Sequence, residues 1–237
     1  MRRFAADYQE FFRQPGVPGL MAVALLTRMP VGMIGLALLL HLRESLGSFA
    51  IAGIVSGIYF VALAIGGPIQ GRIMDRSGPR NVVWVTSAVH PLALIAVLLL
   101  ADARAPLPAI ALAGVVAGVF ATPKMVLIRT LWRHRFADEE NRRRAFSLDA
   151  VLVELNFTLG PAIVAAVVAA AGARAAFATA ISVSIASILL FLASPVLRHF
   201  PGGTQEERHL LGPLREGQLV AVFVATLGFT AAVGPVS

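Results

Sequence analysis

The sequence contains no cysteine, which excludes disulfide bonds and thiol chemistry. Charged residues are also scarce: they make up 14% of the 237 residues, compared with about a quarter in a typical soluble domain. Lysine is nearly absent, because nineteen of the 20 basic residues are arginine. This arginine bias is typical of GC-rich bacterial genomes, so we expect a bacterial protein.

Motifs of common enzymes are missing as well. The sequence has no HExxH, no Walker-type loop, no G-x-S-x-G and no metal-spaced His/Cys cluster. We therefore expect no enzymatic activity, no metal and no cofactor. A cleavable signal peptide is not evident either, because residues 1–17 are polar and mixed in charge and no cleavage site follows a short apolar core.

Apolar residues, by contrast, make up 57% of the chain and come in blocks of about twenty. A helix of that length crosses roughly 30 Å of hydrocarbon at 1.5 Å per residue. Strands of a membrane barrel would alternate apolar and polar residues, and these blocks do not. The composition therefore predicts an all-α protein that crosses the lipid bilayer several times.

Seven such blocks predict seven membrane spans, at about residues 18–41, 47–70, 81–101, 107–130, 146–171, 175–197 and 218–237. They divide the chain into an N-terminal segment (1–17), a six-helix bundle (18–197), a polar linker (198–217) and a seventh helix (218–237). Prolines 30, 91, 123 and 161 lie inside spans, where proline kinks or breaks a helix.

Basic residues alternate between the two ends of the spans. The N-terminal segment and every second connection hold fifteen arginines, and the other connections hold three: Arg43, Arg104 and Arg174. Because cytoplasmic loops carry the excess of basic residues, we expect a cytoplasmic N-terminus in a bacterial plasma membrane. The same distribution explains the net charge of +7 without a nucleic-acid partner.

One charged motif stands between the second and third spans, on the predicted cytoplasmic side: Gly71-x-x-x-Asp75-Arg76-x-Gly78-x-Arg80. It resembles the signature loop of the major facilitator superfamily of transporters. That resemblance implies a six-helix N-terminal bundle of 3+3 inverted repeats, the start of a second bundle, and a loop that clasps the two bundles. The alternative is a solvated, positively charged loop.

Two features of this motif follow from its residues. Asp75 can pair with Arg76 or Arg80, or lie at a helix N-terminus. Gly78 permits a turn that a side chain would hinder, and Pro79 is suited to begin the third span.

A second stretch, which runs from Ser147 through Asn156 to Gly160-Pro161, is similar to the fifth span of bacterial, particularly actinobacterial, facilitator proteins. Gly160 and Pro161 match the glycine-proline of the antiporter motif there, and they predict a helix kink. The match is partial, because Asn156 stands where the motif usually carries glycine. The first span also carries Arg28 in place of the acidic residue of one class of drug antiporters.

Ionisable residues inside spans are costly, and they usually face protein or water. Counted from the predicted span ends, Arg28, Lys124 and Glu154 share one layer and can form a substrate or proton-coupling site. The alternatives are a structural ion pair, a lysine that reaches the interface, and an interhelical hydrogen bond for Asn156. Asp149 is expected near the mouth of the fifth span, in its first turn.

The sequence and the resemblance thus predict a secondary transporter of a small organic solute, with alternating access, coupling to H⁺ and efflux as the direction of transport. Its expected partners are the bilayer, the solute and a second six-helix bundle that this chain does not supply. The alternative is a truncated or non-transporting membrane protein that acts as a binding or assembly partner.

Overall fold

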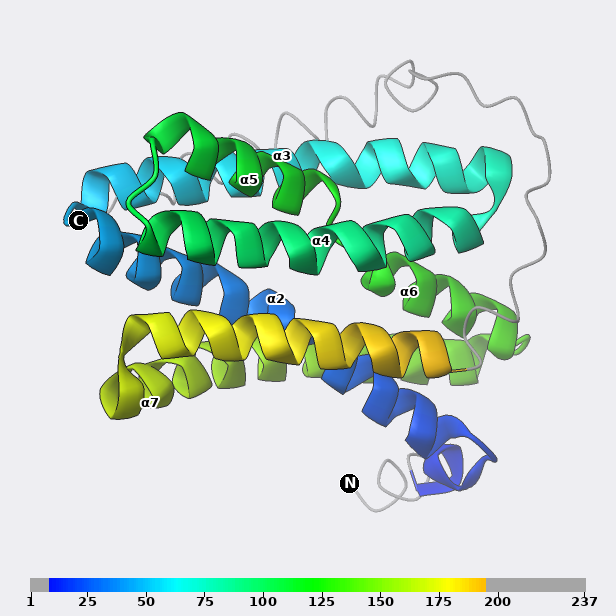
Figure 1. Ribbon diagram of the computed structural model, residues 1–237. Helices are drawn as coiled ribbons and strands as arrows, with labels where there is room; N and C mark the ends of the chain where they lie inside the picture. The colour runs from blue at the N-terminus through cyan, green and yellow to red at the C-terminus, as the bar shows by residue number, and fades with distance from the viewer. Residues whose placement is uncertain (1–8, 195–237) are drawn as a thin grey trace, which may run out of the picture. The chain divides into compact units, whose positions relative to one another are not determined.

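The computed structural model describes residues 9–194, and the elements it describes are helical. The main helices, coloured along the chain in Figure 1, are α2 (Val17–Leu46), α3 (Phe49–Ser77), α4 (Pro79–Asp102), α5 (Leu107–Val119), α6 (Lys124–Arg135) and α7 (Glu139–Ala193). The described residues lie within one compact unit. The predicted linker (198–217) and seventh span (218–237) lie outside the described residues and stay predictions.

Within the described part, five helical stretches are long and apolar enough to cross a membrane. Four of them correspond to the first four predicted spans, and the fifth is α7. The 55 residues of α7 measure roughly 80 Å at 1.5 Å per residue, more than twice the thickness of a bilayer core. Gly172 interrupts this helix with a φ of 86°, and Figure 1 shows the chain folding back there. The break coincides with the predicted connection between residues 171 and 175.

Two spans differ from prediction around the charged motif. Residues 71–77, expected in a loop, belong to the last turns of α3, and α4 begins at Pro79. Gly78 alone separates the two helices, with a φ of 79° that favours glycine. The turn at Gly78 and the start of the third span at Pro79 are therefore as predicted, but the loop is one residue long.

The fourth span is broken rather than continuous. Pro123 has no N–H group and its ring excludes the carbonyl four residues earlier, so a helix through this position loses the hydrogen bond to Val119. The side chain of Gln70, from α3, donates to the Val119 carbonyl at 2.6 Å and to the Ala121 carbonyl at 3.1 Å. The break between α5 and α6 is thus stabilised by a hydrogen-bond donor from a neighbouring helix.

The helices pack around two clusters of buried apolar side chains. One cluster joins α2, α3, α4, α5 and the second part of α7, and it includes Leu38, Leu94 and Phe177. The other joins the first turns of α2 to α4, α6 and α7, and it includes Val83 and Trp132. The most extensive contacts between elements are those of α2 with α7 and of α3 with α5.

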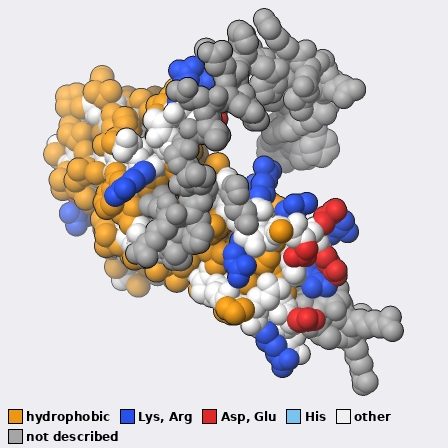
Figure 2. Space-filling view, turned by 90° about the vertical axis from the view of Figure 1, so that its right-hand side faces the viewer, with side chains coloured by type: hydrophobic (Ala, Val, Ile, Leu, Met, Phe, Trp, Pro, Cys, Tyr) orange, Lys and Arg blue, Asp and Glu red, His pale blue; other side chains and the backbone are white. Residues whose placement is uncertain are grey.

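Charged side chains concentrate where α6 ends and α7 begins. Figure 2 looks onto the end of the molecule that holds this segment, and it shows acidic and basic side chains gathered apart from a hydrophobic part. Exposed charged residues of this segment are Arg133, Arg135, Glu139, Glu140 and Arg143. Asp138 caps α7 by accepting a hydrogen bond from the Asn141 N–H at 2.7 Å.

Candidate functional site: a buried charged network on α2, α6 and α7

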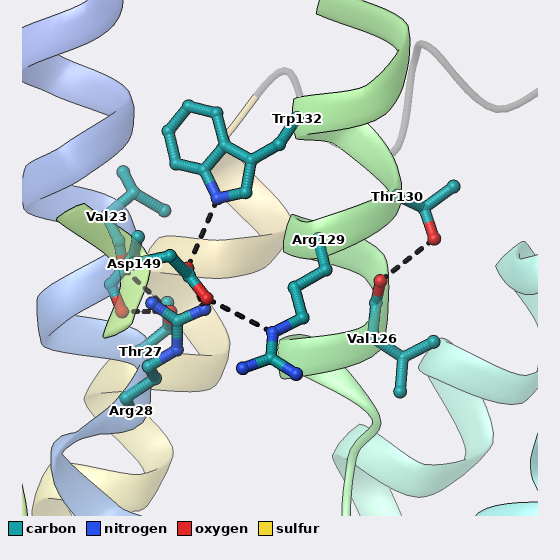
Figure 3. A network of polar contacts seen from close by, with 9 residues as sticks. Val23, Thr27, Arg28, Val126, Arg129, Thr130, Trp132 and Asp149 are labelled. Carbon is teal, nitrogen blue, oxygen red and sulfur yellow. Dashed lines mark hydrogen bonds and ion pairs between the residues drawn. The ribbon is translucent and has the colours of Figure 1, made fainter. Parts of the chain in front are cut away.

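An ion pair between Arg28 of α2 and Asp149 of α7 lies at the centre of the site (Figure 3). Arg28 Nη2 donates to Asp149 Oδ1, and both side chains are buried, with exposed fractions of 0% and 1%. Two other nitrogens of the guanidinium group, Nε and Nη1, are buried without a hydrogen-bond partner among the described residues. The two charges therefore depend on each other far more than on solvent.

Two side chains of α6 complete the network around the same carboxylate. Arg129 Nε donates to Asp149 Oδ2 at 3.1 Å, and Trp132 Nε1 donates to Oδ1 at 3.2 Å. Asp149 thus holds three helices together through one carboxylate. The charges of Arg28, Arg129 and Asp149 add up to one positive charge. Arg129 is the half-exposed member, so the excess positive charge is in contact with solvent.

Local structure explains why α6 can reach this carboxylate. The break at residues 120–123 allows α6 to begin anew at Lys124, so its direction is not fixed by α5. Arg129 and Trp132 are three residues apart and therefore share one face of α6. Trp132 is fully buried and stacks on Phe136, which anchors that face in the second apolar cluster.

The structure does not bring Arg28, Lys124 and Glu154 into contact with one another. Arg28 pairs with Asp149, whereas the side chain of Glu154 is exposed and forms no hydrogen bond or ion pair within the described residues. The expectation for Asp149 was wrong for a related reason. Because α7 begins at Glu139, Asp149 lies almost three turns into the helix and not in its first turn.

Lys124 occupies a separate polar site. Its side chain is 7% exposed, and Nζ donates to the Ser187 hydroxyl of α7 at 2.5 Å. It forms no ion pair with a carboxylate in the part of the chain that the structure describes. Lys124 therefore does not reach the interface in the way expected of a lysine near a helix end.

Asn156 and Gly160 lie where α2 and α7 cross. A Cβ atom at Gly32 would lie 2.4 Å from the Asn156 backbone oxygen, and one at Gly160 would lie 2.6 Å from the Gly32 carbonyl carbon. The helix continues through Gly160 and Pro161, and Gly172 is the non-helical residue of α7. Gly32 and Gly160 thus permit a close crossing of α2 and α7, and the kink predicted at Gly160 and Pro161 stays a prediction.

The remaining motif residues stand apart from this network. Asp75, Arg76 and Arg80 are exposed and form no ion pair or hydrogen bond within residues 9–194, so the expected pairing of Asp75 is not present there. A Cβ atom at Gly71 would meet nothing within 4 Å. This end of α3 is open in the described unit.

Sequence reasoning missed Arg129, Trp132 and the pairing of Asp149. Their signal is visible in retrospect: Asp149 and Glu154 are the two carboxylates that follow the charged segment before the long apolar part of α7. The buried Arg28 needs a carboxylate as its ion-pair partner, and these two were the candidates. No group of three His, Asp or Glu side chains that could hold a metal occurs among the described residues.

Comparison with known proteins decides the family. The family model of the Major Facilitator Superfamily matches residues 20–236, which is most of the chain. The chain belongs to this superfamily. Its members are secondary transporters, not enzymes, and the five apolar helices fit a multi-pass membrane protein of that family. No curated protein matches the sequence.

Proposed function

We propose that this facilitator chain takes part in the H⁺-coupled export of a small organic solute by alternating access across a bacterial plasma membrane. The observation that carries the proposal is the position of Glu154. It is the single ionisable residue between positions 150 and 173, and its side chain is exposed beside the exposed apolar residues Val151, Leu155 and Phe157.

A carboxylate on a membrane-spanning helix can face lipid, protein or water. Facing lipid, a charged side chain costs several kcal/mol, so ionisable residues in spans face protein or a water-filled path. The face of α7 that carries Glu154 is therefore the face that meets the transport path. A carboxylate there can bind the coupling proton in one state and release it in another.

Arg28 and Asp149 have a different role in this proposal. Their charges neutralise each other inside the bundle, so they fix α2, α6 and α7 as one body. Lys124, bound to Ser187, ties the start of α6 to the second part of α7. Glu154 is thus the coupling candidate, and the solute meets the α7 surface beside it.

The partner of the open α3 surface is a second six-helix bundle. Gly53, Gly57, Gly67 and Gly71 are spaced for one helix face, and a Cβ atom at each would meet nothing within 4 Å. Small residues in this arrangement allow a helix of another bundle to approach closely. Asp75, Arg76 and Arg80, without partners in the described unit, supply the polar contacts of a cytoplasmic clasp.

Proton-driven transport in lipid vesicles tests this function. A thermal-shift screen of organic solutes on the purified protein first supplies a substrate, and its movement is then followed under an imposed pH gradient. We expect Glu154→Gln to bind the substrate but to lose the response to the gradient. The control is Glu139→Gln, a charge-removing change in the exposed Arg143 pair. Equal coupling in both variants would remove Glu154 from the proton path.

A further inference from the structure

A polar pocket of about 220 Å³ lies at the end of the bundle away from the Gly78 turn. Its lining comes from the ends of α2 and α4, the connection after α4, and the second part of α7. The residues that carry the argument are His41, Glu44, Asp102, Arg104 and Arg174. None of them belongs to the network around Asp149 or to the face that carries Glu154.

His41 is the buried member of this pocket. Its side chain is 1% exposed and stacks on Phe177, with ring centroids 5.4 Å apart and planes inclined by 22°. Neither ring nitrogen forms a hydrogen bond of ordinary geometry within the described residues. A buried polar group without a partner costs free energy, so an imidazole in this place needs something to bind.

Asp102 lies between His41 and a competing cation. The His41 Nε2 atom is 3.7 Å from Asp102 Oδ1, which is just beyond hydrogen-bond length. On the other side of the carboxylate, Arg174 Nε donates to Oδ2 at 2.6 Å. Asp102 therefore joins α4 to α7 through Arg174. A small shift would bring it within hydrogen-bond distance of His41 and join α4 to α2.

This cluster is located at the break in α7. Arg174 is the second residue after Gly172, whose φ of 86° reverses the chain. Glu44 Oε2 accepts a hydrogen bond from the Ala173 N–H at 3.2 Å, which caps the second part of α7 with a residue of α2. A change in the charge of the pocket thus acts on both side chains that hold this turn.

The charges around His41 come from every element that packs against it. Burial opposes a positive charge on His41 most strongly, and Arg174 of α7 opposes it as well. Asp102 of α4, the Leu98 carbonyl and Glu44 of α2 favour that charge. Arg104 lines the same pocket after α4. Two carboxylates and two guanidinium groups cancel, so the charge of His41 decides the net charge of the pocket. Histidine is the side chain whose charge ordinarily changes between pH 5 and 8.

We propose that this pocket is a proton-binding site, in which His41 takes a proton from solvent and, as an imidazolium ion, competes with Arg174 for the Asp102 carboxylate. The new N–H donates to Oδ1, and α2 becomes tied to α4. Asp102 then shares its negative charge between His41 and Arg174, which weakens the contact that holds the second part of α7 near Gly172. The pocket senses pH at one end of the bundle, and this inference does not depend on which solute is carried or on the role of Glu154.

Fluorescence of a labelled cysteine tests the site in the full chain in detergent. The natural chain has no cysteine, so Ser45→Cys places a single environment-sensitive fluorophore at the pocket. We expect one step in emission as the pH is lowered from 8. His41→Gln should abolish the step. His90→Gln, which removes another buried histidine and keeps a donor for the Ala117 carbonyl, should leave it unchanged.

Two further variants keep the test decisive if His41→Gln does not fold. Asp102→Asn should move the midpoint to lower pH by about one unit, because the imidazolium loses its attracting charge. Arg174→Gln should move it to higher pH. A wild-type chain without a step, or midpoints unmoved by both variants, overturns the proposal. No measurement of transport enters this test, so its failure is distinct from that of the proposed export function.

Discussion

Gly160 of α7 lies against the backbone of Gly32 in α2, and neither position has room for a methyl group. The atoms in the way are backbone atoms, which a rotamer change cannot move. This contact joins α2 and α7, the two helices with the most extensive packing, at a second place besides the Arg28–Asp149 pair.

Gly160→Ala should therefore destabilise the bundle by about 1–3 kcal/mol, the usual cost of overpacking. The measurement is the midpoint of unfolding in a denaturing detergent. The matched control is Gly53→Ala, because a Cβ atom there meets nothing within 4 Å and alanine favours a helix over glycine. Equal loss in both variants would contradict the close crossing.

Asp149→Asn should cost about 3–5 kcal/mol, because it leaves the buried Arg28 charge without its counter-charge. The same unfolding assay measures it. Glu139→Gln, in an exposed pair with Arg143, should change stability by less than about 1 kcal/mol. Arg28→Met combined with Asp149→Leu should recover much of the loss, since neither buried charge of this pair then remains. A double variant as unstable as Asp149→Asn would argue against a structural pair.

Gln70→Met should destabilise the break between α5 and α6. It keeps the size of the side chain but removes the donor to the Val119 and Ala121 carbonyls, at a cost of about 1–3 kcal/mol. Hydrogen exchange at residues 124–128 should also become faster. Thr130→Val is the control, because its exposed hydroxyl bonds only to Val126 of the same helix. Unchanged exchange in Gln70→Met would show that the break needs no donor.

The Asp138 cap of α7 should make the stability of the folded protein depend on pH. Hydrogen bonds from the backbone and then the side chain of Asn141 lower the pKa of Asp138 below its ordinary value of 3.8. A carboxyl group with a lowered pKa stabilises the folded state above the ordinary value, and the effect fades as pH falls through the lower folded-state pKa. The melting temperature of Asp138→Ala should therefore lie below that of the wild type at pH 7, with a smaller difference at pH 3.

Asp138→Asn separates the charge from the cap. Asparagine is a good N-cap without a titrating group, so its melting temperature should stay close to the wild type and lack the acid-dependent part. A wild-type advantage over alanine that persists undiminished in acid would assign the effect to the hydrogen bond alone.

The sequence predicted most of the fold because apolar block length and proline or glycine positions act locally. The turn at Gly78, the start of α4 at Pro79 and the reversal near Gly172 all follow from such signals. Helix ends were predicted less well, because charged residues 71–77 and 139–145 continue helices beyond the apolar blocks. Their hydrogen bonds propagate the helix where hydropathy no longer marks it.

The site was harder to predict, because its contacts join distant segments. Depth along a span gave Arg28 and Glu154 similar levels, but it contained no information on which way each side chain faces around its helix. Burial distinguishes the two carboxylates of α7: Asp149 faces inward to α2 and α6, and Glu154 faces outward. The break at Pro123, which allows α6 to reach Asp149, also changes direction in a way that a count of residues does not reveal.

The separation of 121 positions between Arg28 and Asp149 has a consequence for biosynthesis. At about 5–20 residues per second, the ribosome needs roughly 6–24 seconds to reach Asp149 after Arg28 has been made. During that interval the first helix must hold a solitary guanidinium group, which costs about 2.5–3.5 kcal/mol at the centre of a helix during insertion. The apolar residues of the first span must offset this cost until Asp149 arrives with the fifth span.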